Sequence, residues 1–590
     1  VAGEVEPGES MVIESAAERR WAYYVDQPLL AEAAALAPDS IRALRLIDPA
    51  LGSGHFLVVA LDLLVALYRE EAEQRGEGGQ PQWSDRAIVE SILANNLFGI
   101  DLDPRAVAVA KAALGLAARR VCPEARLDRL NLVAPTLNLA RVDSEDPALI
   151  ELSRALEQDF AISAESTLAL VQRLASADQL GSLLKIDHAL DEALGPDSRP
   201  DAKHRVRARL EQFLAQGPGI QYSRILEEGC YDIVVANPPY QATAKIAQSG
   251  YIERHYPLGK ADLYAAFMQR NLELAREGGI VAQVSMNGWM FLKQYAGLRQ
   301  ALLGQHSLRT IVDLLWCAFE QMRHNTVAMV CFARGPSPDT ISIGLLPSPR
   351  DERDESLAAL QRKRAALLGQ VGRHEFDPQA LRVVPDWPLV FWWSPAFLQA
   401  YAQSEKIGEC GEVRQGMATA ANARFLRRPW EVHYRPPPRL DSQRSNEDPI
   451  YEGWAAYIKG SAGIAWIEPL QDLIAWRDDG RENRLLAGST AGKNREYYFR
   501  PAVAFSKIGA HFNARLHRYP SIFDVAGSSV FVADVDRAVT VMNSRLARTI
   551  LRDLNPTVNF QVGDVVRLPM PPLVGCDRIV ATLDEAFTLH

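Results

Sequence analysis

Hydrophobic and polar positions alternate along the first 335 residues in segments of strand and helix length. In RALRLIDPALGSGHFLVVALDLLVALYREE (42–71), a short apolar run at Leu44–Ile47 precedes a glycine-rich turn and then apolar positions at helical spacing from near His55. NLFGIDLDPRAVAVAKAALGLAARR has the same order: a strand ending at Ile100, an acidic turn and an amphipathic helix. Two such units predict an α/β fold with a parallel sheet and helices on both faces.

The pattern that follows predicts how the sheet continues. Residues 143–216 show helical periodicity without strand-like runs, which indicates a helical insertion. An apolar run before Asn237 resumes the sheet, and KADLYAAFMQRNLELAREGG (260–279) predicts a helix that stops at the Gly-Gly pair before the strand GIVAQVSM. TIVDLLW and TVAMVCFAR are typical of two more strands, which we expect to form an antiparallel hairpin that closes the sheet.

The pattern changes after Gly335. A chain of 590 residues exceeds the size of a single hydrophobic core. We therefore expect one α/β domain at residues 1–335, a helical linker at 336–380, and a separate α/β or mainly β domain at 381–590, where Trp, Pro and short segments are frequent.

Composition is typical of a soluble globular protein, with 48% hydrophobic and 23% charged residues. No apolar run reaches about eighteen residues and no signal-peptide pattern opens the chain, so we expect no membrane segment. The six cysteines are scattered without a CxxC pair, which argues against disulfides or a zinc site and favours a reducing cytoplasm. Because the first residue is Val1 rather than Met, we expect that an upstream segment is missing or that the chain is a fragment.

The net charge of −9 argues by itself against nucleic acid binding. Between Arg484 and Arg518, however, seven Lys and Arg residues and a single acid, Glu496, are interleaved with aromatic residues. Such a stripe can bind phosphates even in an acidic protein. The alternative is a solvated face over ordinary core aromatics, and the stripe taken alone favours that alternative.

The turn DPALGSG (48–54) lies directly between a predicted strand and a predicted helix. Gly52 and Gly54 permit a tight turn and the close approach of a ligand. A dinucleotide site would have GxGxxG and an acid about twenty residues later, whereas here only GxG is present and Asp101 comes 53 residues after Asp48. Asp48 repels phosphate but suits a cationic amino group, and Asp101 can accept both hydroxyls of a ribose. These features favour S-adenosylmethionine (SAM) over NAD.

The strand before Asn237 ends in Asn-Pro-Pro-Tyr. Proline cannot donate to a sheet ladder, so the strand stops there and holds Asn237 and Tyr240 at its carboxyl end, where open α/β sheets bind ligands. A rigid strand exit without chemistry is an equally good interpretation of this tetrapeptide taken alone.

DPALGSGHFL, GIDLDP and NPPY, in this order, resemble the motifs of Rossmann-like amino-methyltransferases that act on DNA adenine, in the gamma arrangement. DLYAAF (262–267) and AFEQMRHNTVAMV (318–330) are similar to further motifs of that class. The stretches NNLFGIDLDPRAV, YPLGKADLYAAF, QGMATAANARFLR, IFDVAGSSVF and LNPTVNFQVGD resemble the PglX-like adenine methyltransferases of BREX phage-defence systems, which are related to type IIG restriction–modification methylases. The resemblance covers most of residues 40–565.

This resemblance implies a Rossmann-like SAM-dependent methyltransferase domain at 1–335 and an α/β target-recognition domain at 381–590 that binds double-stranded DNA. It implies methyl transfer from SAM to N6 of a flipped adenine, by a cytoplasmic host-marking component that has other defence proteins as partners. The implied cofactor-binding residues are Tyr24, Asp48, Ala50, Gly52, Gly54, Asp101, Leu102 and Asp178. The implied catalytic loop is Asn237, Pro238, Pro239 and Tyr240, with Tyr240 and Phe319 stacking on the target base and no metal ligand.

The chemistry of such a loop follows from the poor nucleophilicity of the adenine amine, whose lone pair is delocalised into the ring. The Asn237 side-chain oxygen and the Pro238 carbonyl can each accept one N–H, which draws the nitrogen toward tetrahedral geometry and stabilises the positive charge that develops on it. No strong general base is needed. A base within a duplex must be flipped out to reach the loop.

The second domain would supply phosphate contacts for positioning and base contacts for specificity. The expected DNA contacts are Arg414, Arg424, Arg427, Arg495, Arg500, Lys507 and Arg515. Two stretches depart from the family pattern: YYVDQP (23–28) stands where a Tyr-Thr-Pro-like turn is usual, and Ala420-Ala421 stand where Gly-Asp is usual.

Three alternatives share parts of this pattern. Protein and RNA methyltransferases also use NPPY, but would not need so large a C-terminal domain. The methylase part of a type IIG enzyme, or of another defence system such as DISARM, would have the same motifs; for a nuclease, Pro385-Asp386 is not followed by E-x-K on a plausible strand. A non-catalytic DNA-recognition subunit would have an inactive methyltransferase site, whereas NPPY and the glycine turn are intact here.

Overall fold

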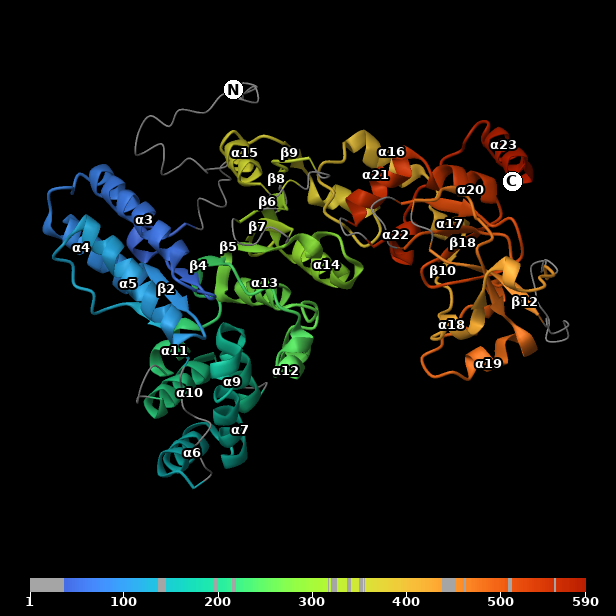
Figure 1. The fold of residues 1–590 in the computed structure, drawn as a ribbon. Helices are drawn as coiled ribbons and strands as arrows, with labels where there is room; N and C mark the ends of the chain where they lie inside the picture. Colours follow the sequence, from blue (N-terminus) through green and yellow to red (C-terminus); the bar gives the residue numbers. More distant parts are fainter. Residues whose placement is uncertain are drawn as a thin grey trace. The chain divides into compact units, whose positions relative to one another are not determined.

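The computed structural model describes residues 37–135, 145–195, 200–214, 219–316, 318–319, 326–336, 341–349, 354, 356–437, 453–460, 463–507, 512–555 and 559–589. The chain divides into two compact units, drawn in Figure 1. The first comprises residues 1–289 and 297–378, and the second comprises 290–296 and 379–590. In the described part of the chain, no helix is both long and apolar enough to cross a membrane.

A nine-stranded sheet forms the centre of the first unit, in the order β3-β2-β1-β4-β5-β7-β6-β8-β9. Strands β3, β2, β1, β4 and β5 run parallel, and β7 is antiparallel to both β5 and β6. The α/β fold with a parallel sheet is thus confirmed. The strands are β1 (Leu46–Asp48), β2 (Leu97–Ile100), β3 (Asn131–Val133), β4 (Tyr231–Ala236), β5 (Ala275–Met286), β6 (Ser307–Leu315), β7 (Val327–Ala333), β8 (Ser342–Leu345) and β9 (Arg373–Phe376).

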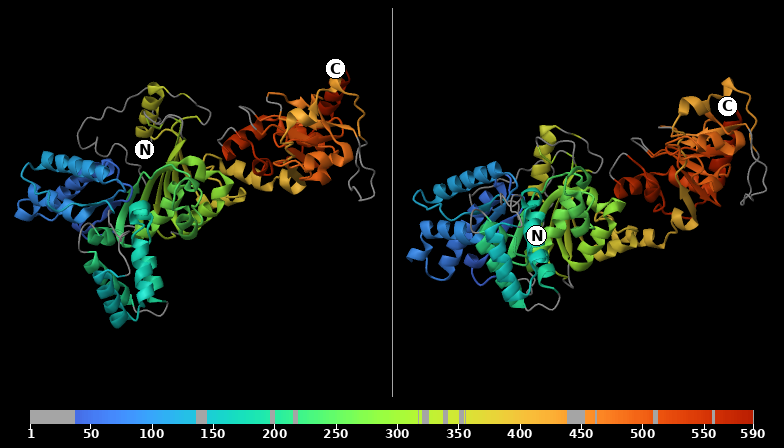
Figure 2. Two further views of the ribbon diagram at one scale, coloured as in Figure 1. Left: turned by 60° about the horizontal axis from the view of Figure 1, so that its bottom comes forward. Right: turned by 90° about the horizontal axis from the view of Figure 1, so that it is seen from below.

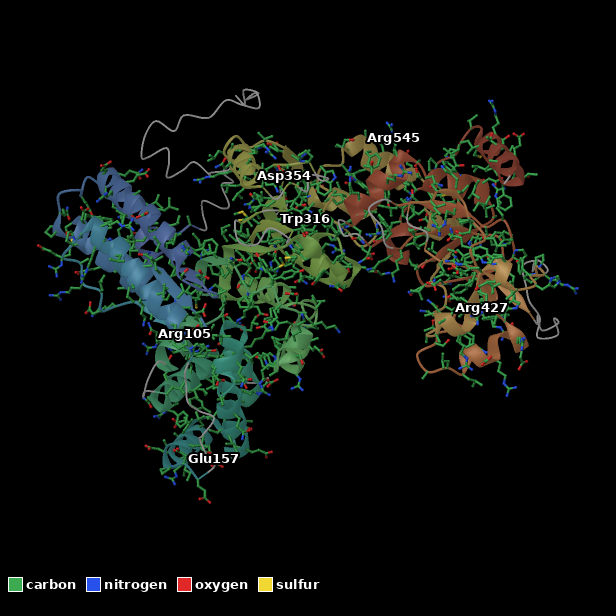
Figure 3. The ribbon with its side chains drawn as sticks, in the orientation of Figure 1. Arg105, Glu157, Trp316, Asp354, Arg427 and Arg545 are labelled. Carbon is green, nitrogen blue, oxygen red and sulfur yellow. The ribbon has the colours of Figure 1, made fainter. Side chains whose placement is uncertain are left out.

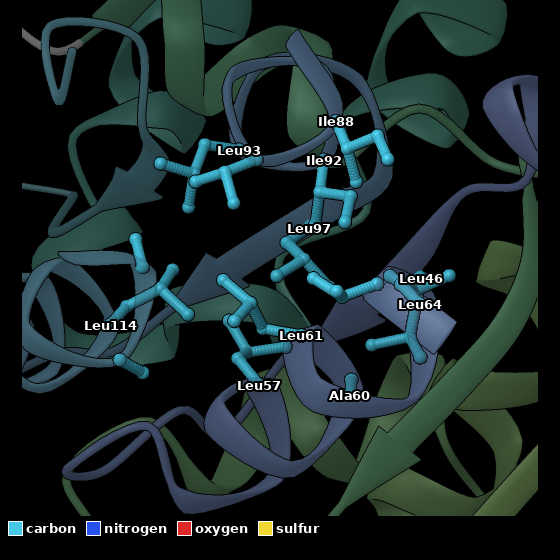
Figure 4. Close-up of a cluster of buried hydrophobic side chains, with 14 of the residues drawn as sticks. Leu46, Leu57, Ala60, Leu61, Leu64, Ile88, Ile92, Leu93, Leu97 and Leu114 are labelled. Atoms are coloured by element: carbon cyan, nitrogen blue, oxygen red, sulfur yellow. The ribbon is translucent and has the colours of Figure 1, made fainter. Parts of the chain in front are cut away.

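Both faces of the parallel strands are buried. Leu46 and Leu97 pack into a hydrophobic cluster with three helices that follow β1 and β2, shown in Figure 4. Ile47 points to the opposite face by strand alternation and is also fully buried. Burial on both faces explains why these strands are continuous apolar runs. The helices of the sheet region are α3 (His55–Gln74), α4 (Asp85–Ser91), α5 (Pro104–Val121), α11 (Gly219–Ile225), α13 (Leu263–Leu274) and α14 (Ala296–Gln305).

The described residues of the predicted helical insertion form helices joined by short connections, without strands. Its helices pack on one another and extend away from the sheet, as both Figure 1 and Figure 2 show. They are α6 (Pro147–Phe160), α7 (Ala164–Leu174), α8 (Ala177–Leu180), α9 (Ile186–Leu194) and α10 (Pro200–Phe213).

The helix expected over 260–279 is shorter than the pattern predicts. It ends at Leu274, and the AREGG segment begins strand β5 instead. Ala275 pairs with Tyr231, and a Cβ on Gly279 would come within 2.9 Å of the Tyr231 carbonyl oxygen. Sheet pairing with a local bulge therefore replaces the last helical turn, because the neighbouring strand offers the backbone groups a partner.

The expected helical linker at 336–380 contributes to the sheet in the structure. It contains β8 and β9 as well as α15 (Leu357–Leu368), and β8 pairs with β6, so the β6–β7 pair does not close the sheet. Lys363 of α15 is buried, and its Nζ donates to the carbonyl oxygens of Leu314 (3.1 Å) and Trp316, at the end of β6. Trp316 is labelled in Figure 3.

The second unit contains two sheets, in the orders β10-β18-β15-β16-β13 and β11-β14-β12-β17. Buried aromatic side chains, among them Tyr498, Phe499 and Phe523, form part of its core. The strands are β10 (Gly411–Arg414), β11 (Leu426–Arg427), β12 (Trp454–Ile458), β13 (Trp466–Ile467), β14 (Asp472–Ala475), β15 (Val503–Phe505), β16 (Ala514–Leu516), β17 (Ser521–Phe523) and β18 (Ser529–Val532). The helices include α16 (Pro395–Gln403), α18 (Asn422–Phe425), α20 (Val535–Met542), α21 (Arg545–Leu554) and α23 (Cys576–Leu589).

Candidate active site

A cavity of about 760 Å³ lies at the carboxyl ends of β1, β2 and β4. The order of the sheet reverses between β1 and β4, and open sheets bind ligands at such switch points. The volume is in the range of small-molecule sites. Of the residues expected from sequence, the cavity is lined by Ala50, Gly52, Asp101, Leu102, Asn237 and Pro239. One cavity therefore joins the glycine turn, the acidic turn and the NPPY loop.

The two glycines of the turn differ in what they contact. Gly52 (φ +52°) lines the cavity, and a Cβ on it would meet no atom within 4 Å, so its backbone is open to a ligand. Gly54 (φ +80°) packs against α5, where a Cβ would come within 2.9 Å of the Ala110 Cβ. Gly54 thus permits α3 to approach α5, and it is not one of the residues that line the cavity.

Asp101 connects the acidic turn to the glycine turn. Its Oδ2 accepts a hydrogen bond from the Gly52 N–H (2.8 Å), and its Oδ1 accepts one from the Asp103 N–H (2.9 Å). Each carboxylate oxygen can accept two hydrogen bonds and here accepts one, so each keeps a lone pair for a ligand hydroxyl. The next residue, Leu102, is 46% exposed and presents an apolar surface beside Asp101.

Asp48 lies behind the glycine turn and is only 1% exposed. Its Oδ1 accepts a hydrogen bond from the Ala50 N–H (3.0 Å). Burial raises the pKa of Asp48 to about 7; the Ala50 N–H opposes this rise, and the negative charge of Asp101 adds to it. A cation bound near the turn would favour the charged carboxylate, so ligand binding and deprotonation of Asp48 are linked.

This linkage predicts a pH dependence of cofactor binding. Below pH 7 Asp48 is mostly neutral, so affinity for the expected cofactor, SAM, should rise about fivefold between pH 6 and pH 7 and level off above about pH 8. The ligand's α-amino group stays protonated in this window. Isothermal titration of SAM at each pH measures the effect, and Asp48→Asn should flatten the profile. An equal slope in that variant would rule out Asp48 as its origin.

Residues 179–183 of the helical insertion form a wall of the cavity, within the stretch 176–184 where the resemblance implied a cofactor contact at Asp178. Asp178, the residue expected there, is exposed and is not part of the lining, whereas its neighbour Gln179 is. The Ser182 Oγ donates to the Pro49 carbonyl oxygen (2.7 Å) and so attaches the wall to the glycine turn.

Buried side chains from other segments hold this wall. Arg270, fully buried on α13, donates through Nε to the Ser182 carbonyl oxygen (2.8 Å) and pairs with Glu228 and Glu273. The Tyr222 hydroxyl donates to the Gly181 carbonyl oxygen (2.7 Å). Arg270 was not among the residues expected from the sequence; a charged residue at helical spacing from Leu263 and Phe267, on the apolar face of the helix, is the signal that could have indicated it.

A hydrogen bond between two of its own side chains stabilises the NPPY loop. Asn237 and Pro239 line the cavity, while Pro238 is buried. The Tyr240 hydroxyl donates to the Asn237 Oδ1 (3.1 Å), and its ring meets the ring of Tyr264 edge-on, with centroids 6.4 Å apart. Burial raises the pKa of Tyr240 to about 12, so the hydroxyl remains a donor at neutral pH.

The segment that carries Phe319 approaches the same region. Ala318 and Tyr240 both pack against an apolar cluster formed by residues of β5, β6, β7 and β8. Phe319 itself is 37% exposed, three residues after Trp316, whose carbonyl oxygen is held by Lys363. Tyr24, the remaining expected cofactor residue, lies outside the described residues.

Arg515 does not fit the expected contact with DNA. Its side chain is fully buried in the second unit, where Nε pairs with Glu468 (2.5 Å). Its Nη1 donates to the Ser506 Oγ (2.8 Å) and its Nη2 to the Lys459 carbonyl oxygen (3.0 Å). The expectation is corrected: this guanidinium is enclosed by protein acceptors and holds β16 to its neighbours.

Arg515→Met should therefore destabilise the second unit, by about 3–5 kcal/mol, because Glu468 would be left buried without its partner. Urea unfolding measures the change. Arg424→Met is a matched control, since Arg424 is exposed and its pair with Glu482 lies on the surface, where such pairs contribute about 0–1 kcal/mol. Equal stability of the two variants would contradict the structural role of Arg515.

The other expected DNA contacts are more accessible. Arg414 and Arg500 both lie over the Tyr497 ring, 5.3 Å and 5.4 Å from its centroid. Arg427, labelled in Figure 3, donates through Nη1 to the Ala423 carbonyl oxygen (3.0 Å). Arg495 pairs with Asp479, and Lys507 is half-buried.

The Ala420-Ala421 departure has a physical consequence. Ala420 adopts φ +58°, a left-handed conformation that favours glycine. Ala421 is the N-cap of α18 and makes no side-chain capping bond, which an aspartate would make. The Gly-Asp usual in the family therefore suits this backbone better than the residues present.

Comparison with known proteins gives two kinds of match. Residues 95–317 match the family described as Eco57I restriction-modification methylase. The structure of a nuclease-deletion mutant of the Type ISP restriction-modification enzyme LlaGI, in complex with a DNA substrate mimic, superposes with a TM-score of 0.48 at 12% identity, over 91% of this chain and 44% of that chain.

Two relatives align along nearly the whole chain. The adenine-specific methyltransferase PglX of Lacticaseibacillus casei (strain Zhang) is 26% identical, over 93% of this chain and 46% of the relative. The adenine-specific methyltransferase BrxX of Escherichia coli O9:H4 (strain HS) is 28% identical, over 92% of this chain and 45% of the relative. The chain spans less than half the length of either. In sequence it is similar to the PglX and BrxX adenine-specific methyltransferases, and the resemblance predicted from its motifs is confirmed.

Proposed function

We propose that this chain is a SAM-dependent DNA adenine N6-methyltransferase. The observation that supports this most is the cavity at the switch point of the sheet, which is lined at once by Gly52, Asp101 and Asn237. The residues expected for a cofactor site and for an amine-binding loop thus line one cavity, as direct group transfer between two bound ligands requires.

The residues present fit SAM. The free lone pairs of Asp101 suit the two ribose hydroxyls, and the open backbone at Gly52 allows close approach of the amino-acid part. The buried carboxyl of Asp48 gains a favourable partner when a cation binds nearby. Leu102 offers an apolar surface to a purine ring. SAM, when bound, supplies an electrophilic methyl group on a sulfonium.

The NPPY loop would prepare the adenine amine for attack. The Asn237 Oδ1 and the Pro238 carbonyl oxygen would each accept one N–H of the amine, which frees its lone pair and stabilises the positive charge on nitrogen. Oδ1 already accepts the Tyr240 hydroxyl and has a second lone pair for the amine. Two prolines keep these oxygens in place before the base arrives, so little reorganisation is needed.

DNA would reach this site through a flipped base, with Tyr240 and Phe319 stacking on its two faces. The second unit would act as target-recognition domain. Of its basic residues, Arg414 and Arg500 are placed on the Tyr497 ring, where the guanidinium planes are held for contact with phosphates or base edges.

We further propose that the chain marks host DNA as part of a phage-defence system in the cytoplasm, together with other proteins of that system. The similarity to PglX and BrxX along 92–93% of the chain supports this proposal.

A methyl-transfer assay tests the proposed function. The purified chain and SAM are incubated separately with duplex DNA, ribosomal RNA and a peptide-release-factor protein, and the digests are analysed by mass spectrometry. We expect N6-methyladenine in the DNA alone. Methyl transfer to RNA or to protein glutamine would overturn the proposed substrate. Binding of SAM and DNA with every adenine unmodified would indicate a recognition subunit.

A further inference from the structure

The segment that carries Phe319 leaves the sheet at the end of β6 and returns at the start of β7, and buried polar side chains hold both ends. Lys363 of α15 is 3% exposed, and its Nζ donates to the carbonyl oxygens of Leu314 (3.1 Å) and Trp316. We propose that Lys363 is a positioning residue for methyl transfer, which holds the backbone before Phe319 so that this ring can stack on the target base. The inference rests on the proposed function.

The end of β6 lies at the same edge of the sheet as the NPPY loop. Strand β7 is antiparallel to both β5 and β6, so β6 runs in the same direction as β5 and its parallel neighbour β4. The carboxyl ends of β4 and β6 therefore share one edge. Side-chain packing agrees, because Ala318, Tyr240 and Leu367 of α15 all pack against one apolar cluster that includes Leu314. The supports of Phe319 are thus next to the proposed catalytic loop.

The backbone at the end of β6 has a conformation that needs support. Leu315 adopts φ +54°, in the left-handed region that is unfavourable for a residue with a Cβ. The Asp313 Oδ1 accepts the Leu315 N–H (3.3 Å), and Lys363 binds the carbonyl oxygens on both sides of Leu315. Strained backbone that its surroundings hold in place is frequent at active sites. Its position here, four residues before Phe319, favours a role in placing that ring.

Asn287 links the two ends of the segment. Its backbone N–H donates to the carbonyl oxygen of Thr326 (3.0 Å), directly before β7, and its Nδ2 donates to the Asp313 Oδ1 (3.0 Å). Asn287 and Asp313 are both buried, where water competes little for these hydrogen bonds. They come from the strands β5 and β6 or their ends, whereas Lys363 comes from α15. The geometry of the segment therefore depends on α15 as well as on the sheet.

The place of Lys363 on α15 is one where packing alone favours an apolar residue. Ala359 and Lys363 are the buried positions of this helix, and Leu367 follows one turn later on the same face. A methionine would fill the position without the cost of burying a charge. The ammonium group offsets that cost through its hydrogen bonds to the end of β6. What a lysine adds at this position is therefore a hold on that backbone.

A double-mutant cycle of Lys363→Met and Phe319→Ala tests the inference, with the duplex DNA that the wild-type chain methylates. The readouts are single-turnover methyl transfer at saturating SAM and DNA, and titration of SAM. We expect each single variant to be slower by about tenfold, with SAM affinity within about twofold of wild type. In the Phe319→Ala background, Lys363→Met should slow transfer by less than about twofold, because Lys363 acts through Phe319.

Arg362→Met is the matched control on the same helix. Arg362 is exposed and pairs with Asp354 at the surface (2.8 Å), so its replacement should leave the rate within about twofold of wild type. An equally slow control would show that any change in α15 impairs the enzyme, which would overturn the specific role of Lys363.

The remaining outcomes separate this inference from the proposed function. Equal slowing by Lys363→Met with and without the Phe319 ring, a parallel loss of SAM affinity, or an unchanged rate in Phe319→Ala would each overturn the inference alone. A wild-type chain that methylates no DNA would overturn the proposed function and this inference with it. If Lys363→Met does not fold, Lys363→Gln, which keeps a donor amide, takes its place in the cycle under the same criterion.

Discussion

Asn237→Ala is expected to reduce methylation of duplex DNA by about 10²–10³-fold while SAM affinity stays within about twofold of wild type. The variant removes the Oδ1 acceptor that stabilises charge on the adenine nitrogen, and loss of one such preorganised group typically costs 10²–10³ in rate. It also removes the acceptor of the Tyr240 hydroxyl, which would leave the stacking ring less well held. Asn237 is exposed on the cavity, so folding should be little affected.

Single-turnover methylation and SAM titration of the same preparation measure the two quantities. Tyr240→Phe is the informative companion, because it keeps the stacking ring and removes only the hydroxyl that donates to Asn237. A loss of about tenfold or less is expected for it. An equal loss of SAM binding and of methylation in Asn237→Ala would contradict a role in the chemical step.

The second large effect is expected at Asp101, where a substitution should weaken SAM binding strongly and change the rate of methyl transfer little. Asp101→Ala removes the acceptors proposed for the ribose and also the acceptors of the Gly52 and Asp103 N–H groups. Hydrogen bonds to a charged group contribute about 1.5–3 kcal/mol each, so SAM affinity should fall about 100-fold or more. At saturating SAM the methylation rate should recover to within about fivefold of wild type.

Asp101→Asn is the matched control because it is of the same size and retains one acceptor oxygen. It should give an intermediate loss of SAM affinity, of about tenfold. A rate that stays low for Asp101→Ala at saturating SAM would show that the carboxylate acts in catalysis or that the turn has collapsed. Circular dichroism and thermal unfolding of the same variants separate these two causes.

Several parts of the fold and site could be predicted because their signals are local. A strand followed by a glycine turn and an amphipathic helix is a contiguous pattern, and it placed α3 and α5 correctly. Asp101 and Asn237 come directly after apolar runs, so their position at the carboxyl edge of the sheet follows from the strands themselves. Parallel strands end at the same edge, and the motifs therefore meet in one cavity.

Other parts depend on partners that are distant in the sequence. Arg270 holds the Ser182 carbonyl 88 residues away, and Lys363 holds Leu314 from a segment expected as a linker. Neither contact can be predicted from hydrophobic periodicity in the sequence, because each joins one side chain to one distant backbone oxygen. The end of α13 also depends on a segment distant in the sequence, because Ala275 pairs with Tyr231 instead of continuing the helix.

The amino-acid sequence by itself determined the class of the fold, the order of the motifs and the chemistry available at the cavity. Only the tertiary structure decided which charges and polar groups can act there. Arg515 and Arg500 are both basic residues among aromatics, yet one is enclosed with Glu468 and the other lies over Tyr497. Gln179 rather than Asp178 lines the cavity. The residue type determines which hydrogen bonds and ion pairs a side chain can form. Burial and distance, which arise from long-range packing, determine which of them it does form.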